Sequence, residues 1–141
     1  MRIKKIISYF FLILMLICSS ACSFHIGSKN TNNVYVVESE SSFIDYSVEN
    51  DKVYILCNVT LSNTGDNMKK IKIAAICSED YKIGLLKNEK IYAVDENEEE
   101  KIFVIDAKSK KTFENIVFLG KYGGKHKKGN RLLPEIVLES V

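Results

Sequence analysis

The sequence predicts an all-β domain, an antiparallel β-sandwich of about seven to nine strands, behind an N-terminal signal peptide. Three observations support this prediction. Apolar and polar residues alternate with period two over most of the chain beyond residue 33. Clusters of Gly, Asn, Asp and Ser separate these segments at spacings of roughly ten residues. No segment beyond residue 33 shows a convincing helical period.

The N-terminal segment has the three parts of an export signal. Residues 1–5 form a cationic head, residues 6–17 form an apolar run, and small residues follow before Cys22. The apolar run is shorter than the ~20 residues that a membrane-spanning helix needs. A cleaved signal peptide over residues 1–21 is therefore favoured over an uncleaved N-terminal anchor.

The dipeptide Ala21-Cys22 resembles the cleavage site of bacterial lipoprotein signals, in which a small residue precedes a cysteine. Ser20 fits the pattern, whereas Ser19 stands where these signals usually carry Leu. The resemblance implies that Cys22 is diacylated on sulfur, which would anchor the chain at the extracytoplasmic face of the cell membrane. The alternative is ordinary cleavage after Ala21 and a secreted protein, because Ser19 and Ala21 also satisfy the small-x-small rule.

Removal of the signal changes the charge balance of the chain. The sequence has 20 basic and 18 acidic residues, and the signal carries three basic residues and no acid, so 17 basic residues remain against 18 acidic ones. Proteins that bind nucleic acid present a basic face across the domain. We therefore exclude nucleic acid as a partner, and we expect one domain from the remaining length of about 120 residues.

The mature chain divides into a tether and a domain. Residues 22–33 lack periodicity and are rich in Ser and Asn, which indicates a flexible tether at the lipidated N-terminus. The domain then covers residues 34–141. In chain order, strands are expected at residues 34–38, 43–48, 53–62, 71–77, 82–86, 90–94, 101–106, 112–119 and 135–140.

The clearest strand is 53–62. Its inward file consists of alternate apolar residues, namely Val53, Ile55, Cys57, Val59 and Leu61. The turn-forming sequence NTGDN follows, and a hairpin centred on Gly65 is the simplest connection to the next strand. Near the C-terminus, Pro134 suits the entry to an edge strand because proline cannot donate a ladder hydrogen bond.

Two motifs resemble the small immunoglobulin-like domains, of FxLYD-like or telokin-like type, of Gram-positive bacterial surface lipoproteins. They are the strand end 58–65 (NVTLSNTG) and the polar turn and strand 106–118 (DAKSKKTFENIVF). The resemblance covers roughly residues 43–141, and it implies an immunoglobulin-like sandwich that binds or scaffolds without catalysis. The chain departs from the commoner variant, which has a Tyr-Asp pair after its third strand, by placing CSED at residues 77–80.

The four cysteines differ in location. Cys18 leaves with the signal, Cys22 is the expected lipidation site, and Cys57 and Cys77 remain in the domain. A disulfide between the last two is chemically allowed outside the membrane. A simple hairpin would instead pair Cys57 with a residue near Ala74, so two buried free thiols are the alternative. Zinc is excluded because a second pair of ligands is missing.

No catalytic motif is present, and we expect no enzyme activity. His126 lies in a Gly- and Lys-rich segment that is typical of a solvated loop. The same segment carries basic residues suited to contact with anionic lipid headgroups or wall polymers. They are Lys121, Lys125, Lys127, Lys128 and Arg131. The alternative is a long solvated connection into the last strand.

The segment 95–100 (DENEEE) is predicted to be an acidic hairpin tip whose charges discourage edge pairing. Asp95, Asn97 and Glu99 match the first, third and fifth positions of a calcium loop, but Glu100 stands where the sharp turn needs Gly, so an EF-hand is excluded. A looser carboxylate site for calcium remains the alternative.

Together these patterns predict a membrane-anchored, extracytoplasmic lipoprotein that acts as a non-catalytic binding or scaffolding module. We expect no cofactor and no metal, and a protein or cell-envelope partner. The alternative is surface capture of a specific peptide, toxin or small ligand, in an immunity or sensing role.

Overall fold

The computed structural model describes residues 29–126 and 129–141, so the predicted signal, Cys22, Lys127 and Lys128 lie outside the described residues. The strands are β1 (Asn30–Thr31), β2 (Val34–Val36), β3 (Ser42–Glu49), β4 (Lys52–Asn63), β5 (Lys69–Ile76), β6 (Lys90–Val94), β7 (Ile102–Ile105), β8 (Ser109–Lys121) and β9 (Glu135–Ser140). The two short helices of this part of the chain are η1 (Glu38–Glu40) and α2 (Ser78–Lys82). The all-β prediction is confirmed. Neither helix is long or apolar enough to cross a membrane.

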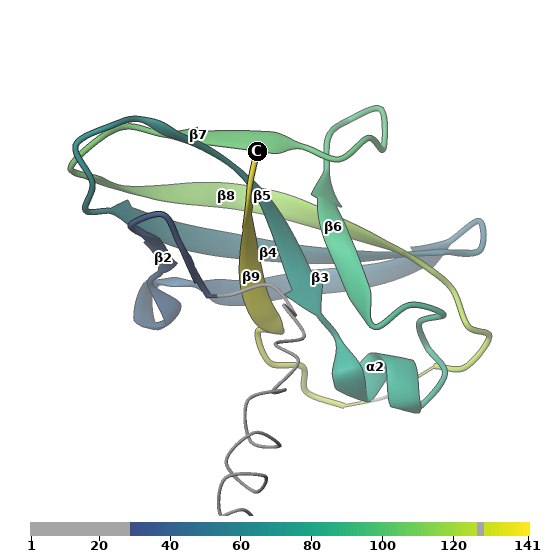
Figure 1. Ribbon diagram of the computed structural model, residues 1–141. Helices are drawn as coiled ribbons and strands as arrows, with labels where there is room; N and C mark the ends of the chain where they lie inside the picture. Colours follow the sequence, from purple (N-terminus) through teal and green to yellow (C-terminus); the bar gives the residue numbers. More distant parts are fainter. Residues whose placement is uncertain (1–28, 127–128) are drawn as a thin grey trace, which may run out of the picture.

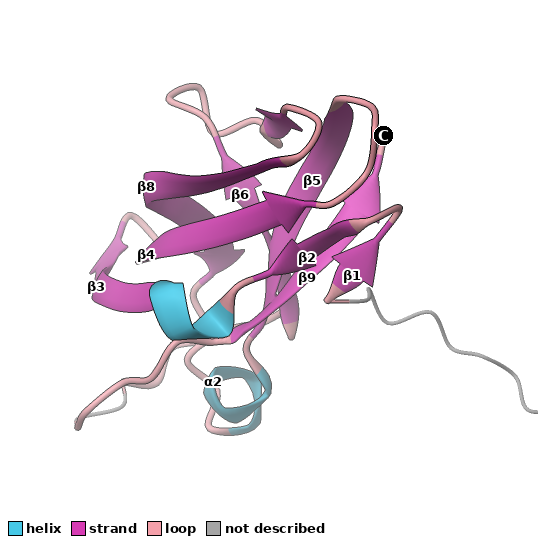
Figure 2. Cartoon of the chain, turned by 90° about the vertical axis from the view of Figure 1, so that its left-hand side faces the viewer, coloured by secondary structure: helices cyan, strands magenta, loops and turns pink. Residues whose placement is uncertain are grey.

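The nine strands form one curled antiparallel sheet. Its order is β1-β2-β4-β8-β6-β5-β7, with β3 also paired to β4 and β9 also paired to β5. The pairing of β6 with β8, where Tyr92 lies opposite Leu119, joins the half that contains β4 to the half that contains β5. Figures 1 and 2 show β5 and β9 running steeply across β4 and β8.

The curl of the sheet brings the inward files of β4 and β5 into one core. The β4 file is the one that the sequence predicts, and all five of its residues are buried. From β5, Ile71, Ile73 and Ala75 pack into the same cluster. Full burial of an aliphatic side chain stabilises a fold by about 1.5–3 kcal/mol, so this shared core is what holds the two halves together.

Two tight turns contain consecutive residues with positive φ. Asn32 and Asn33 (φ 45° and 68°) join β1 to β2, and Asn50 and Asp51 (φ 50° and 60°) join β3 to β4. This combination is the type I′ hairpin turn, and Asn and Asp tolerate it better than other residues with a side chain. The first turn places residues 30–33 in the hairpin that β1 and β2 form.

The predicted hairpin centred on Gly65 is wrong, because β4 and β5 do not pair. One edge of β4 is taken by β3 and then β2, and the other by β8. The chain turns away at Asn63, which is buried and donates through Nδ2 to the carbonyl oxygens of Asn67 (2.9 Å) and Asp106 (3.0 Å). Asn63 Oδ1 accepts the Gly65 N–H at 3.0 Å. These bonds send the chain into the other half of the sheet.

The predicted strand at residues 82–86 is also wrong, since the end of α2 and a turn occupy this segment. The Leu85 and Leu86 N–H groups both donate to the carbonyl oxygen of Asp80, at 2.9 and 3.1 Å. Gly84 takes a φ of 85°, the left-handed conformation in which helices often end. The turn buries two consecutive leucines, which a strand would send to opposite faces.

Candidate functional site

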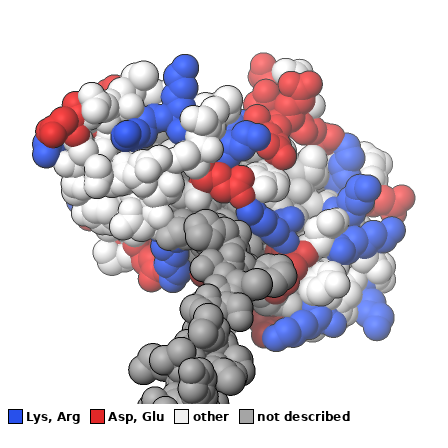
Figure 3. All heavy atoms as spheres, viewed as in Figure 1, with Lys and Arg blue, Asp and Glu red and all other residues white. Residues whose placement is uncertain are grey.

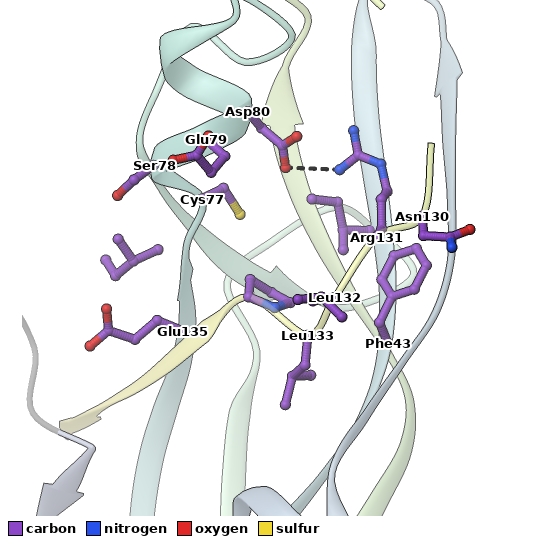
Figure 4. A pocket seen from close by; sticks show the side chains of 13 residues that line it. Phe43, Cys77, Ser78, Glu79, Asp80, Asn130, Arg131, Leu132, Leu133 and Glu135 are labelled. Carbon is purple, nitrogen blue, oxygen red and sulfur yellow. Dashed lines mark hydrogen bonds and ion pairs between the residues drawn. The ribbon is translucent and has the colours of Figure 1, made fainter. Parts of the chain in front are cut away.

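A cavity of about 350 Å³ opens at the end of the sheet where α2 lies. Phe43 of β3 and Ile55 of β4 line it from one half of the sheet. The end of β5 and the start of α2, residues 76–80, line it from the other half. The segment 130–135, which leads into β9, completes the wall. Figure 4 shows Arg131 of this segment extending toward Asp80 of α2.

The ion pair between Arg131 and Asp80 is the most buried one among the described residues. Arg131 Nη1 donates to Asp80 Oδ2 at 2.8 Å, and the two side chains are only 8% and 12% exposed. The guanidinium also stacks on Tyr46 of β3, with Cζ 3.9 Å from the ring centroid. Arginine is suited to this place because its planar group stacks on an aromatic face while it donates in its plane.

Two further donors of Arg131 have no acceptor. Nε and Nη2 are buried, and no atom of the described residues accepts a hydrogen bond from either. A buried donor without an acceptor costs about 1–3 kcal/mol, and more when it is charged. The guanidinium therefore has the capacity to donate to one more group, from water or from a ligand.

Next to this buried arginine, the chain exposes a leucine. Leu132 is 86% exposed and lines the cavity. A buried Arg beside an exposed Leu inverts the usual distribution of polar and apolar residues. With Phe43, Leu133 and Pro134, Leu132 gives the cavity an apolar side next to its polar one.

The two thiols of the domain are free and buried. Cys57 lies on β4 and Cys77 follows β5 at the cavity wall. Burial raises the pKa of each thiol to about 12. Of the two alternatives from the sequence, the structure has the pair of buried thiols and not the disulfide. A thiol that keeps its proton is a weak nucleophile, so both cysteines act as small apolar groups here.

The basic residues predicted to form one contact surface differ in their exposure to solvent. Lys121 and Lys125 are exposed. The aliphatic part of the Lys125 side chain packs over Gly84, so closely that a side chain at position 84 would contact it. Figure 3 shows basic side chains gathered at the α2 end of the molecule. Lys127 and Lys128 lie outside the described residues. Arg131 does not belong to this surface, because the ion pair with Asp80 buries it.

The acidic hairpin tip is not simply solvated. Glu98 accepts hydrogen bonds from Lys52 and from the Tyr54 hydroxyl, the latter at 2.7 Å, and together these bonds lower the pKa of its carboxyl. Glu100 pairs with Lys72 of β5 at 2.5 Å. Across residues 29–126 and 129–141, no group of three side chains is arranged to hold a metal ion. The carboxylates of this tip instead hold the β6–β7 connection against β4 and β5.

Comparison with known proteins gives no identification: no protein-family model, no curated protein and no solved structure matches this chain. Sequence reasoning missed Asp80 and the cavity, because the ion pair joins residues 51 positions apart. The one available signal was a lone Arg beside Leu132, Leu133 and Pro134.

Proposed function

We propose that this chain is a lipid-anchored, extracytoplasmic module that binds a partner and does not catalyse a reaction. The location rests on Ala21-Cys22 at the end of the apolar run, which resembles a lipoprotein signal. The binding role rests on one structural observation, the cavity with a buried Arg131 that has two unused donors. Cavities of this size, with apolar walls and a few polar groups, are typical of ligand sites.

The short distance between Cys22 and the start of the domain supports a position of the cavity close to the membrane. Hydrogen bonding and charge from Glu38, and to a smaller extent the charge of Glu135, raise the pKa of Lys29. Glu135 lines the cavity, so the charge of one cavity residue acts on the start of the described chain. Lys29 is seven positions after Cys22, so the two residues are at most about 25 Å apart. An anchor at Cys22 would therefore hold the cavity within reach of membrane-associated partners.

The proposal includes a relationship to the immunoglobulin-like sandwiches of bacterial surface lipoproteins. Its support is the motif at residues 58–65, in which buried Asn63 and the N–H of Gly65 shape the end of a long central strand. The signal peptide over residues 1–21 belongs to the same proposal. Capture of a ligand is favoured over pure scaffolding because a scaffold needs no cavity with unused donors.

Metabolic labelling tests the anchoring. Cells that express the full chain are grown with an alkyne analogue of palmitate, and the label on the protein is read after gel separation. We expect label on the wild type and on Cys18→Ala, and none on Cys22→Ala. Globomycin, which blocks the lipoprotein signal peptidase, should leave a larger, still labelled precursor. Equal labelling of Cys22→Ala would overturn the proposal.

A further inference from the structure

We propose that the cavity beside Arg131 captures a peptide segment in which an apolar side chain lies next to a basic one. The inference rests on the proposed binding role and names the class of partner for that site. Three features of the cavity carry it: an exposed apolar side, two unused donors, and an excess of carboxylates.

The apolar wall of the cavity is suited to contact an apolar side chain of the peptide. Phe43, Leu133 and Pro134 form a wall that continues into Leu132 at the rim. At 86% exposure, Leu132 packs against little of its own chain. An apolar group that entered the cavity would remove part of this surface from water, which is the main favourable term in most protein associations.

The unused donors of Arg131 are suited to bind a backbone carbonyl group of a peptide ligand. Arg131 is held by Asp80 and Tyr46, so its Nε and Nη2 are fixed before a ligand arrives. Both atoms are buried, so an acceptor, whether from a ligand or from a bridging water, reaches them only when the 130–135 segment shifts slightly. A backbone carbonyl oxygen satisfies such a donor without adding a negative charge beside Asp80.

The charges around the cavity account for the basic side chain. Glu79, Asp80 and Glu135 line it, and Arg131 is the one cation among the lining residues. Asp80 already pairs with Arg131. Glu79 is exposed and lies 3.8 Å from Lys82, a distance at which an exposed pair contributes little. The residues that line the cavity therefore carry more carboxylates than cations, although basic side chains gather around them at this end of the molecule, and within the cavity this excess favours a basic side chain over a carboxylate.

Photo-crosslinking to the full chain tests this inference. The lipidated chain is placed in nanodiscs of uncharged phosphatidylcholine, so that lipid charge does not attract the probe. The probe is the blocked tripeptide Ac-Lys-photoleucine-Lys-NH2 with a fluorescent tag, and its matched control is Ac-Glu-photoleucine-Glu-NH2. Crosslinked residues are mapped by mass spectrometry, and affinity is read from fluorescence anisotropy.

We expect the lysine peptide to crosslink within residues 76–80 or 130–135, and the glutamate peptide to crosslink there far less. Leu132→Ala should weaken binding by about tenfold, from the loss of buried apolar surface. The pair Glu79→Gln and Glu135→Gln should weaken it by about 1.5- to 5-fold per charge. Ile102→Ala and Glu114→Gln change comparable exposed side chains away from the cavity, and they should leave affinity unchanged.

Several results would overturn the inference. These are crosslinks outside the cavity, equal binding of the two peptides, tighter binding of the glutamate peptide, or no binding at about 1 mM peptide, a concentration that would detect even a weak site. If the peptide does not bind but Cys22 is labelled normally, the peptide-capture inference is wrong and the proposed lipid anchor stands. If the peptide crosslinks in the cavity but Cys22 carries no lipid, the anchor is wrong and peptide capture stands.

Discussion

Replacement of Asp80 by alanine should strongly destabilise the domain. The substitution removes the only hydrogen-bond acceptor that the described residues provide for the side chain of Arg131. The guanidinium would then be a buried cation with three nitrogens that lack an acceptor. Removal of one partner from a buried ion pair typically costs about 3–5 kcal/mol, and the side chains here are 8% and 12% exposed.

A second substitution shows whether the buried charge causes this loss. Arg131→Met keeps an unbranched apolar stem next to Tyr46 and removes both the cation and its unused donors. In the Asp80→Ala background, Arg131→Met should therefore restore about 1–3 kcal/mol, even though it removes another native side chain. The two changes are expected to be strongly non-additive, because the residues are in direct contact.

Urea unfolding of the full chain, followed by tyrosine fluorescence and circular dichroism, measures these free energies. The chain has no Trp and seven Tyr residues, so tyrosine is the intrinsic probe. Glu79→Ala is the matched control, since it removes a carboxylate from the same helix whose partner Lys82 is exposed, and it should cost less than about 1 kcal/mol. An Asp80→Ala protein as stable as the control, or a double variant that shows the sum of the single effects, would refute the reasoning.

The remaining predictions concern the thiols and the turn after β4. Cys57 and Cys77 should resist alkylation by iodoacetamide at pH 8 and react once urea unfolds the chain; rapid labelling of the native protein would contradict their burial. The free energy of unfolding should fall as pH rises from 9 toward 12, because the unfolded thiols lose their protons first, and Cys57→Ala should flatten this slope in pH-dependent urea titrations. Asn63→Ala should cost about 1–3 kcal/mol by leaving part-buried carbonyl groups without donors, whereas Asn67→Ala, which keeps its own carbonyl, should be near neutral; equal effects would dismiss the role of the Asn63 amide.

Local pattern predicted most of the strands because the alternation of apolar residues reports which face is buried. The file from Val53 to Leu61 is buried in the structure, and the sequence shows that directly. The same reasoning failed at residues 82–86, where apolar residues lie in a turn. Their burial depends on the Asp80 carbonyl, which accepts from Leu85 and Leu86, and a five-residue helix is too short to leave a period in the sequence.

The strand pairing and the residues of the cavity could not be predicted from the sequence for a different reason. Neighbours in sequence often pair in a sheet, which favoured the hairpin at Gly65. The side chain of Asn63 instead directs the chain to the other half of the sheet. Arg131 looked like one of several loop cations until the fold brought Asp80 and Tyr46 to it. Contacts between distant residues decide such roles, and a single sequence does not report them.

The mass of the mature N-terminus, measured on protein purified from the membranes of cells that express the full chain, tests the central claim most directly. The account predicts an N-terminal peptide that begins at Cys22 and carries a diacylglyceryl group on sulfur. A peptide that begins at Cys22 with an unmodified thiol, or one that still begins at Met1, would contradict it.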